Sequence, residues 1–403
     1  MIRLALVTHG FVGGGGVPTI AHWLREGLEA QGDYTVDIHD LATSRVDSAS
    51  RRITRPSSWL RSSLRTTRDH PVRHEHWGAN AAEVEAMRYR PRRQLTESLR
   101  GYDLIQVISG SPAWAGAVVG CSRPVILHAA TIAAWERESQ LPESSPSLRL
   151  WRRQMTRITS RIETTVLRRV DVVLVENDVM LAHVRAAGQD RASKVQPGID
   201  TRAFVPAAEG WQRNGPLLTV CRLGDPRKGL ERLVRAYGRL VEQDWSAPPL
   251  ILAGRGAITP AVSELIIQLG LAERIEVRTD VAPADLVRLY QQASVFVQTS
   301  YEEGLGLSVL EAMACGLPVV ATATHGTRET VVDGETGWLV ELGTPDLASA
   351  MAERARFALN GSGSRAGRNG RDRCVAAFST DACLRRFLDV YDTIPLTNTS
   401  RAS

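Results

Sequence analysis

Short apolar runs alternate with helix-periodic stretches along almost the whole chain. In the first 200 residues, the apolar runs that predict strands lie at 3–8, 34–41, 102–109, 124–129 and 170–177. Helical periodicity follows the first of these runs at 19–32 and returns at 145–168. Strands that alternate with helices are typical of a parallel, doubly wound sheet. The first half of the chain therefore predicts a Rossmann-like α/β domain.

The same pattern restarts after a turn-rich connector at 196–215. A helix is predicted where apolar positions step by three and four, at 230, 233, 234, 237, 240 and 241. Further strands are predicted at 216–222, 249–254, 275–279, 294–298, 317–322 and 337–341. We therefore predict two Rossmann-like domains, residues 1–208 and 209–380, with a hinge near 205–215. Residues 381–403 are predicted to form a last helix and tail, and in two-domain chains of this kind such a helix can cross back to the first domain.

Length and composition favour a two-domain globular protein. The chain has 403 residues, too many for one ordinary core, and 23% of them are charged. No apolar run approaches the roughly 18–20 residues of a membrane-spanning helix. The opening MIRLALVTHG is interpreted as a first strand rather than a signal peptide. Five scattered cysteines, never in a CxxC pair, favour a reducing cytoplasm over disulfides or a zinc site.

Positive charge is concentrated in one segment. Residues 41–100 contain thirteen arginines and six acids, a local charge of +7 in a chain of net charge +5. We interpret this segment as an exposed, solvated loop region, without regular structure up to about residue 80 except for a short helix at most. The alternative is that residues 45–100 attract an acidic acceptor, or anionic lipid at the inner membrane face. A nucleic-acid partner is not expected.

A glycine loop, Gly13 to Gly16, separates the first predicted strand from the first predicted helix. Glycines at this place, among them Gly15 and Gly16, let the backbone approach a phosphate at the helix N-terminus. A nicotinamide-type dinucleotide site would need GxGxxG, but no third glycine is in register and Pro18 occupies the early helix. Asp40 ends the second strand, and there it is interpreted as a turn residue.

In the second domain, two cations flank a strand-to-helix loop. In CRLGDPRKGLERL, Arg222 follows a strand and Lys228 begins the next helix. The chain has only two lysines, Lys194 and Lys228, so the placement of Lys228 favours a function. Cations here could neutralise a diphosphate without a metal, and no DxD or similar acidic cluster is visible in the sequence. The alternative is a solvated loop with two ordinary surface charges.

Two carboxylates, Glu303 and Glu311, lie eight residues apart around Gly304 and Gly306. The stretch after these glycines has helical spacing, so backbone N–H groups at the helix start would face an anion or sugar hydroxyls. Carboxylates accept hydrogen bonds from vicinal diols, which both sugars and riboses offer. Each glutamate alone would be interpreted as a solvent-facing helix charge. Two acids around Gly-x-Gly at this spacing favour a ligand site.

The segment EGLGLSVLEAMACGLPVV, from Glu303 to Val320, closely resembles the E-x7-E block of family 4 glycosyltransferases. Those are retaining enzymes with the GT-B fold, two Rossmann-like doubly wound domains that face a central cleft. Other stretches also resemble the family: GGGG, PGIDTRAF, RLGDPRKG, DVAPADLVRLYQQASVFVQTS and THGTRETVVDGETGWLV. The resemblance implies an acceptor-binding first domain and a nucleotide-sugar-binding second domain.

The resemblance also implies residue roles in transfer from a nucleotide-diphosphate sugar, most commonly a UDP-sugar. Arg222 and Lys228 would hold the donor diphosphate, Glu311 the ribose diol and Glu303 the donor sugar. The residues implied to contact sugar or phosphate through their amides are Gly304, Leu305, Gly306 and Leu307.

His128, at the end of PVILHA, matches a first-domain histidine near the transferred sugar. A front-face mechanism without metal or other cofactor is implied, in which the leaving diphosphate helps deprotonate the acceptor hydroxyl. The acceptor itself (a lipid, a glycan or a small natural product) is left open, as is the sugar, because Leu305 replaces the family's usual Phe.

Two other functions share the predicted architecture. A nucleotide-sugar epimerase with the GT-B fold would lack the E-x7-E block. A non-catalytic nucleotide-sugar-binding protein would be expected to have lost some of the four charged residues that are all present here.

Overall fold

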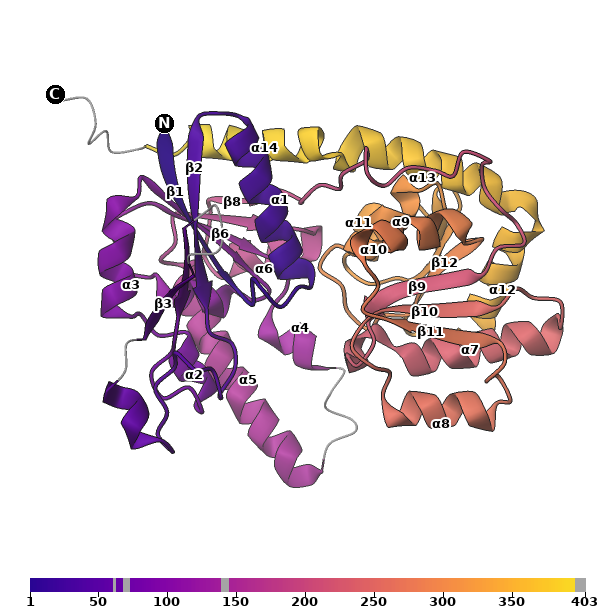
Figure 1. The fold of residues 1–403 in the computed structure, drawn as a ribbon, viewed down its shortest axis with the longest axis horizontal. Coiled ribbons are helices and arrows are strands. Elements are labelled where there is room, and N and C mark those ends of the chain that lie inside the picture. Colours follow the sequence, from indigo (N-terminus) through magenta and orange to yellow (C-terminus); the bar gives the residue numbers. More distant parts are fainter. Residues whose placement is uncertain (61–62, 68–72, 139–144, 396–403) are drawn as a thin grey trace. The chain divides into compact units, whose positions relative to one another are not determined.

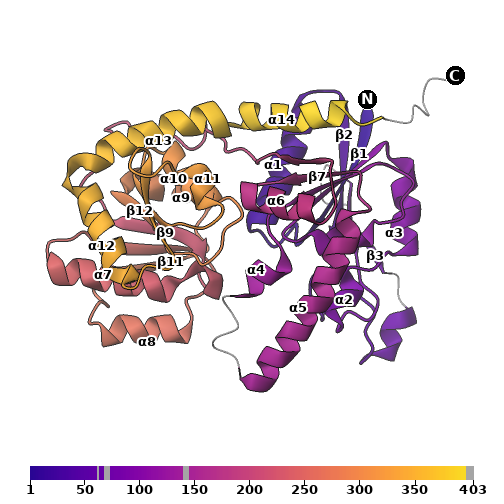
Figure 2. The same cartoon turned by 180° about the vertical axis from the view of Figure 1, so that it is seen from behind.

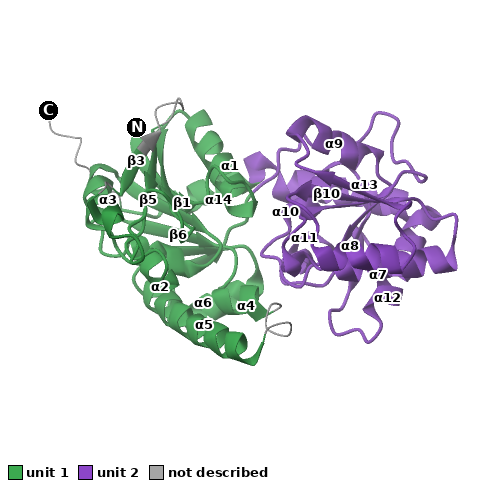
Figure 3. Cartoon of the chain, turned by 60° about the horizontal axis from the view of Figure 1, so that its bottom comes forward, with its two compact units in different colours: residues 1–197, 383–403 green, residues 198–382 purple. Residues whose placement is uncertain are grey.

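The computed structural model describes residues 1–60, 63–67, 73–138 and 145–395, which form two compact units (Figures 1 and 3). Unit 1 comprises residues 1–197 and 383–403, and unit 2 comprises residues 198–382. The sequence pattern predicted the domain boundaries at 208–209 and 380–381, whereas the boundaries between the units lie at 197–198 and 382–383. No helix in the described ranges is both long and apolar enough to span a membrane.

Unit 1 is built on an eight-stranded sheet with the order β3-β4-β2-β1-β5-β6-β7-β8. Every neighbouring pair is parallel except β3 and β4. The strands are β1 (Ile2–His9), β2 (Tyr34–Leu41), β3 (Leu64–Thr67), β4 (His74–Trp77), β5 (Leu104–Ser109), β6 (Val125–Ala129), β7 (Val172–Val175) and β8 (Ala192–Lys194). The central strands β1, β5, β6 and β7 are almost wholly apolar because helices cover both faces of a parallel sheet.

Helices and short 3-10 turns connect these strands. They are α1 (Gly16–Ala30), η1 (Pro56–Leu60), α2 (Glu85–Arg88), α3 (Arg93–Ser98), η2 (Leu99–Gly101), η3 (Pro112–Ala117), α4 (Ala133–Glu138), α5 (Pro146–Leu167) and α6 (Asp178–Ala186). Helix α1 buries Ile20, Leu24 and Leu28, which lie at helical spacing on one face. The long helix α5 runs past the end of the sheet in unit 1, as Figures 1 and 2 show.

The arginine-rich segment 41–100 contains more structure than its weak periodicity predicts. Strand β4 extends the sheet beside β2, with Ile38 opposite His74, so the expectation of a loop up to residue 80 was wrong. The segment also contributes to the core, because Trp77 is buried. Arg92 is only 6% exposed, and its guanidinium donates to the carbonyl oxygens of Trp77 and Arg88. Part of the local positive charge is therefore used inside the unit rather than solvated.

Unit 2 is a six-stranded parallel sheet with the order β11-β10-β9-β12-β13-β14. When the strands are numbered from the first strand of the unit, this order is 3-2-1-4-5-6, the arrangement of dinucleotide-binding α/β domains. The strands are β9 (Leu217–Arg222), β10 (Leu250–Arg255), β11 (Ile275–Thr279), β12 (Val295–Gln298), β13 (Val319–Thr322) and β14 (Gly337–Val340). The helices are η4 (Pro226–Lys228), α7 (Leu230–Gln243), α8 (Pro260–Gln268), α9 (Pro283–Gln292), α10 (Leu307–Ala314), α11 (Thr327–Thr330), α12 (Leu347–Phe357) and α13 (Gly363–Phe378), with a kinked segment η5 (Ala358–Ser362) before α13.

Two apolar cores lie on the two faces of this sheet. One includes Leu233, Tyr237 and Leu240 of α7, and the other includes Tyr290 of α9 and Leu310 of α10. The apolar positions predicted for the helix at 230–241 are therefore the buried face of α7.

The last helix, α14 (Thr380–Asp392), begins in unit 2 and continues into unit 1. In unit 1, Phe387 packs edge-on against Trp23 of α1, with 5.5 Å between ring centroids. The Tyr391 hydroxyl donates to Oε1 of the buried Gln106 on β5 at 2.8 Å. The predicted crossing of the last helix to the first domain is confirmed. Its yellow ribbon is visible in Figures 1 and 2.

Candidate functional site

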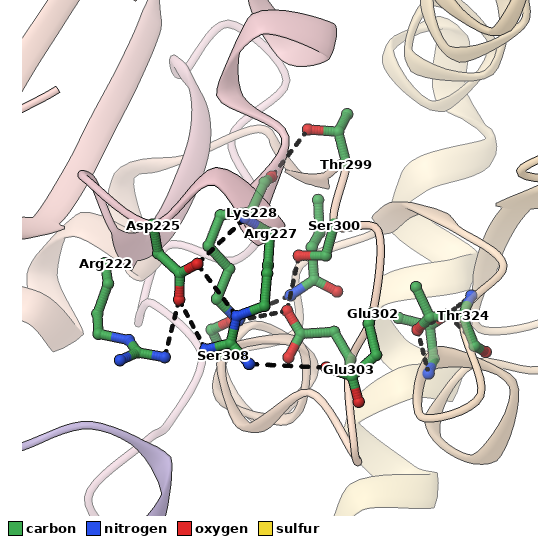
Figure 4. Close-up of polar contacts among 12 residues, drawn as sticks. Arg222, Asp225, Arg227, Lys228, Thr299, Ser300, Glu302, Glu303, Ser308 and Thr324 are labelled. Atoms are coloured by element: carbon green, nitrogen blue, oxygen red, sulfur yellow. Dashed lines mark hydrogen bonds and ion pairs between the residues drawn. The ribbon is translucent and has the colours of Figure 1, made fainter. Parts of the chain in front are cut away.

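The predicted charged residues of unit 2 collect where two neighbouring strands end. Strand β9 ends at Arg222 and strand β12 at Gln298, and the two strands are adjacent in the sheet. The strand order reverses between them, because β10 lies on the far side of β9 and β13 on the far side of β12. In open α/β sheets, ligands bind beyond the carboxyl ends of the strands at such a switch point. Figure 4 shows the polar side chains gathered there.

Lys228 and Glu303 form the central contact of this group. The Lys228 ammonium nitrogen lies 2.6 Å from Oε1 of Glu303, and both side chains are mostly buried, at 18% and 11% exposure. The Ser300 hydroxyl donates to the same carboxylate oxygen at 2.6 Å. The two residues are 75 positions apart in the chain, and the sequence analysis assigned both to one site. In the structure they are in direct contact.

The loop from β9 to α7 holds Lys228 in place. Asp225 caps the short turn η4, and Gly229 then adopts a left-handed conformation with φ 62°. A Cβ at Gly229 would lie 2.3 Å from the carbonyl oxygen of Thr299, so only glycine fits this approach to the strand end. The Thr299 hydroxyl donates to the Gly229 carbonyl at 2.9 Å, which ties this loop to the β12 end.

Arg222 is held by a carboxylate between two arginines. Oδ2 of Asp225 lies 2.8 Å from Arg222 and 2.8 Å from Arg227. Burial by itself would raise the pKa of Asp225, but hydrogen bonds and charge from Arg227, with charge from Arg222, lower it overall. The Arg222 side chain is 52% exposed, so its guanidinium is accessible to an anion in the solvent.

A tight backbone contact shapes the loop that carries Glu303. The N–H of Gly326 donates to the Glu303 carbonyl at 3.0 Å. A Cβ at Gly326 would lie 2.6 Å from the carbonyl carbon of Gly304 and from the nitrogen of Leu305. Gly306 has φ 89°, which permits the abrupt start of α10. Leu305 is 2% exposed and packs in the core, so only its backbone is available to a ligand. Leu307 is the first residue of α10.

Glu311 lies in the second turn of α10 and contacts a different partner. The Tyr290 hydroxyl of α9 donates to Oε2 of Glu311 at 2.6 Å. Burial raises the pKa of Glu311 to about 7, an increase that the hydrogen bond from Tyr290 opposes. Glu311 is therefore a carboxylate that changes charge near neutral pH, and it is not bonded to the Lys228–Glu303 pair.

The glycine loop of unit 1 leaves open space before α1. Gly14 and Gly15 have φ of 68° and 117°, and a Cβ at Gly15 or Gly16 would meet nothing within 4 Å. Asp40 anchors this loop, because its Oδ1 accepts from the N–H of Phe11 at 3.0 Å. The interpretation of Asp40 as a turn residue was wrong, since it lies within β2, buried, as a carboxylate that fixes the loop.

His128 is fully buried in unit 1. It lies on β6 between Ile108 and Leu174 in the sheet register, and its Nε2 is 3.2 Å from the carbonyl oxygen of Val195. Its ring also lies against Phe387 of α14, with 5.6 Å between centroids. Burial lowers the pKa of His128 to about 4, so the ring is neutral at physiological pH. Its role near a transferred sugar stays a prediction.

Three polar residues of the site were missed by the sequence analysis: Asp225, Arg227 and Ser300. Asp225 could have been found because an Asp before Pro is a typical cap of a short turn. Ser300 had no such signal, since a serine after a strand is common in any loop. The described residues contain no group of three His, Cys, Asp or Glu side chains that could share a metal ion.

Comparison with known proteins shows what this chain is similar to. Residues 203–373 match the sequence model of the family described as "Glycosyl transferases group 1". A D-inositol 3-phosphate glycosyltransferase of Corynebacterium efficiens is 29% identical over 242 residues, which are 56% of this chain and 55% of that protein. The protein of the same description from Corynebacterium diphtheriae is 34% identical over 174 residues, 38% of this chain and 40% of that one. The chain thus spans about half the length of the curated relatives it matches.

Solved structures resemble the chain over nearly its whole length. A sucrose-phosphate synthase from Thermosynechococcus elongatus aligns with a TM-score of 0.70 at 22% identity, covering 97% of this chain and 98% of that one. Anabaena HepE in complex with UDP aligns with a TM-score of 0.69 at 18% identity, covering 98% of this chain and all of that one. Together with the two doubly wound sheets, these similarities establish the predicted GT-B fold.

Proposed function

We propose that this chain is a glycosyltransferase that transfers a sugar from a nucleotide-diphosphate donor to an acceptor hydroxyl. The observation that carries the proposal is the Lys228–Glu303 contact of 2.6 Å beside the exposed Arg222, at the switch point of the unit 2 sheet. These residues lie within the segment that matches the group 1 glycosyltransferase family. UDP and UDP-glucose complexes among the structural neighbours support a UDP-sugar as the donor.

The cations act on the leaving group. When the bond from the sugar to the diphosphate breaks, negative charge accumulates on the diphosphate. Arg222 and Lys228 are fixed positive charges at the strand ends, and N–H groups at the start of α10 add a positive dipole. Because these groups are in place before reaction, they stabilise the leaving group without reorganisation. This arrangement suits the retaining, front-face mechanism of family 4 enzymes without a metal ion.

The carboxylates recognise hydroxyls of the donor. Glu303 has a second oxygen beyond the one that Lys228 and Ser300 contact, and this oxygen is the proposed acceptor for a sugar hydroxyl. Glu311, in the second turn of α10, is the proposed acceptor for the ribose diol. In unit 1, the open backbone at Gly15 and Gly16 is the proposed contact for donor phosphate. The neutral ring of His128 is the proposed first-domain group near the sugar.

Calorimetric titration with nucleoside diphosphates tests the donor. We expect UDP to bind more tightly than GDP, and a preference for GDP would overturn the choice of a UDP-sugar. The protein is then incubated with the preferred nucleotide sugar alone, and the products are separated. Slow hydrolysis to free sugar is expected of a transferase, whereas formation of an epimer would support the epimerase alternative. For variants of Lys228, the matched control is Lys194→Ala, because it removes the other of the chain's two lysines, which is paired with Asp178.

Metal independence is tested by chelation. Since Arg222 and Lys228 supply the positive charge at the site, we expect turnover to persist after exhaustive treatment with EDTA. Loss of turnover that added magnesium or manganese restores would contradict this part of the proposal.

A further inference from the structure

Helix α5 of unit 1 has a strongly positive face. Arginines follow one another at a spacing of four, at Arg149, Arg153, Arg157 and Arg161, and Arg152 adds a fifth. No Asp or Glu occurs between Pro146 and Ile162 to offset them. Residues four apart are neighbours on a helix surface, so this series places like charges side by side.

Such a series is unfavourable for the helix itself. Like charges at a spacing of four destabilise an isolated helix. Within the described part of the chain, the guanidinium groups of Arg153, Arg157 and Arg161 form no ion pair or hydrogen bond. These three guanidinium groups therefore do not hold the unit together, unlike that of the buried Arg92 in the segment 41–100.

Large apolar side chains lie exposed among these arginines. Leu150 is 62% exposed and Trp151 is 57% exposed, and Ile158 is also exposed one heptad after Trp151. Leu150, Arg153 and Arg157 lie at spacings of three and four, which places them on one stripe of the helix. Apolar and cationic side chains thus alternate across the same outward face.

The C-terminal half of α5 is anchored in the core of unit 1. Val166 and Leu167 are buried in the core, and Glu163 accepts from the N–H of Ala133 at 2.9 Å. In contrast, residues 146–151 are exposed on every side. Figures 1 and 2 show this half of the helix extending beyond the body of unit 1.

We propose that the N-terminal half of α5 docks unit 1 on an anionic lipid surface. Arginine side chains would contact lipid phosphates, and Trp151 and Leu150 would enter the boundary between headgroups and acyl chains. A helix with an arginine-rich face and exposed Trp and Leu side chains is the sequence signature of interfacial binding. A second copy of this chain fits less well, because it would bring five further arginines towards the first five. The proposal does not depend on the proposed transferase activity.

Co-sedimentation of the full-length chain with vesicles tests the proposal. We expect binding to vesicles of phosphatidylcholine mixed with phosphatidylglycerol, little binding to phosphatidylcholine alone, and weaker binding as salt is added. Each arginine near a charged lipid surface strengthens binding roughly fivefold, so Arg153→Glu/Arg157→Glu should weaken it at least roughly thirtyfold. Trp151→Ala should also weaken binding, with less dependence on salt.

Matched controls come from unit 2. Arg354→Glu/Arg356→Glu on α12 changes the net charge equally, and Trp245→Ala removes a tryptophan that is 73% exposed. Neither control should alter vesicle binding, and circular dichroism should confirm that all variants are folded. Equal binding of the α5 variants and the wild type would overturn the proposal. The proposal would also be overturned if the wild type failed to bind the anionic vesicles but self-associated, and the α5 variants abolished this self-association. Sedimentation velocity measures the self-association.

Discussion

The ammonium group of Lys228 is already neutralised by Glu303 in the structure, so a donor diphosphate would have to share it with this carboxylate. Both side chains are mostly buried, and removal of one partner from a buried pair leaves an uncompensated charge. Ser300 still donates to Glu303 when the lysine is absent, which limits this cost. Substitutions at the pair should therefore affect the reaction more than the fold.

Lys228→Ala should lower kcat by more than it raises the KM for the donor. The proposed contact between Lys228 and the diphosphate would strengthen as charge develops on this leaving group. Loss of one such preorganised contact costs on the order of 3 kcal/mol, roughly a hundredfold in rate. Glu303→Gln should lower kcat and also raise KM, because Glu303 is the proposed contact of the reacting sugar. Steady-state kinetics measure both, with Lys194→Ala as the control. A Lys228→Ala variant with near wild-type kcat/KM and an intact circular dichroism spectrum would refute the site assignment.

Glu311 should make donor binding depend on pH. Its pKa is raised to about 7, so the carboxylate that would accept the ribose hydroxyls becomes protonated as the pH falls below 7. We expect donor affinity in wild type to decrease from pH 8 to pH 6, and Glu311→Gln to bind more weakly at pH 8 with a flatter profile. Calorimetric titration across this range measures the effect. Identical pH profiles for the two proteins would contradict the prediction.

Glu311 should also make the stability of the fold depend on pH. Donor affinity should rise with pH, whereas the contribution of Glu311 to stability should fall. A carboxyl group whose pKa is higher in the folded than in the unfolded chain destabilises the fold at a pH above both pKa values. This cost appears as the pH rises from about 4.5 to about 7 and is complete above it. Glu311→Gln should therefore raise the free energy of unfolding at pH 8, by on the order of 1–3 kcal/mol, and much less at pH 5. Denaturant titration at the two pH values tests the sign.

At the scale of elements, the loop that carries Glu303 is positioned by a glycine of a neighbouring segment. Gly326→Ala would force a methyl group to within 2.6 Å of the backbone at Gly304 and Leu305, although φ of −76° is itself unstrained. We expect the loop to shift, and donor affinity to fall at least roughly tenfold through misplacement of the binding groups. Gly343→Ala is the control, because a Cβ there would meet nothing within 4 Å. Equal donor affinity in both variants would show that the loop tolerates the displacement.

The elements that periodicity predicted are those with apolar runs or one apolar face. The buried strands β1, β5 and β10 and the helix α7 were all predicted close to their observed bounds. Strand β4 was missed because its sequence, HEHW, is polar. Its burial arises from tertiary contacts, such as the hydrogen bond of Trp77 Nε1 to Nδ1 of His39 on β2. Backbone pairing with an existing strand thus overrode a sequence that has little apolar alternation.

The candidate site shows the same division between local and tertiary information. Glycines and charges near the predicted strand ends are local features, and they made Arg222, Lys228 and Glu303 candidates for the site. The sequence could not predict that Lys228 and Glu303 would contact each other, because that contact depends on the adjacency of β9 and β12. Nor could it predict the complete burial of His128, which requires α14 to pack over β6.

At the scale of the whole molecule, α14 should be essential to the stability of unit 1. Phe387 is fully buried against Trp23 and His128, so Phe387→Ala should lower the free energy of unfolding by about 3–5 kcal/mol. Phe357→Ala, at a ring that is 50% exposed, should cost less than half as much. Chemical denaturation followed by tryptophan fluorescence measures both, and equal losses would contradict the structural role of α14.

Unit 1 is assembled from two distant pieces of the chain, whereas unit 2 is continuous. A ribosome that has finished residue 197 must translate all of 198–382 before it delivers the helix that covers α1 and β6. At about 5–20 residues per second this interval lasts roughly ten to forty seconds, far longer than most domains need to fold. During that time the nascent unit 1 exposes the apolar surface that Phe387 and Leu384 later cover. The earliest residues to be made should therefore be among the last to reach their native packing.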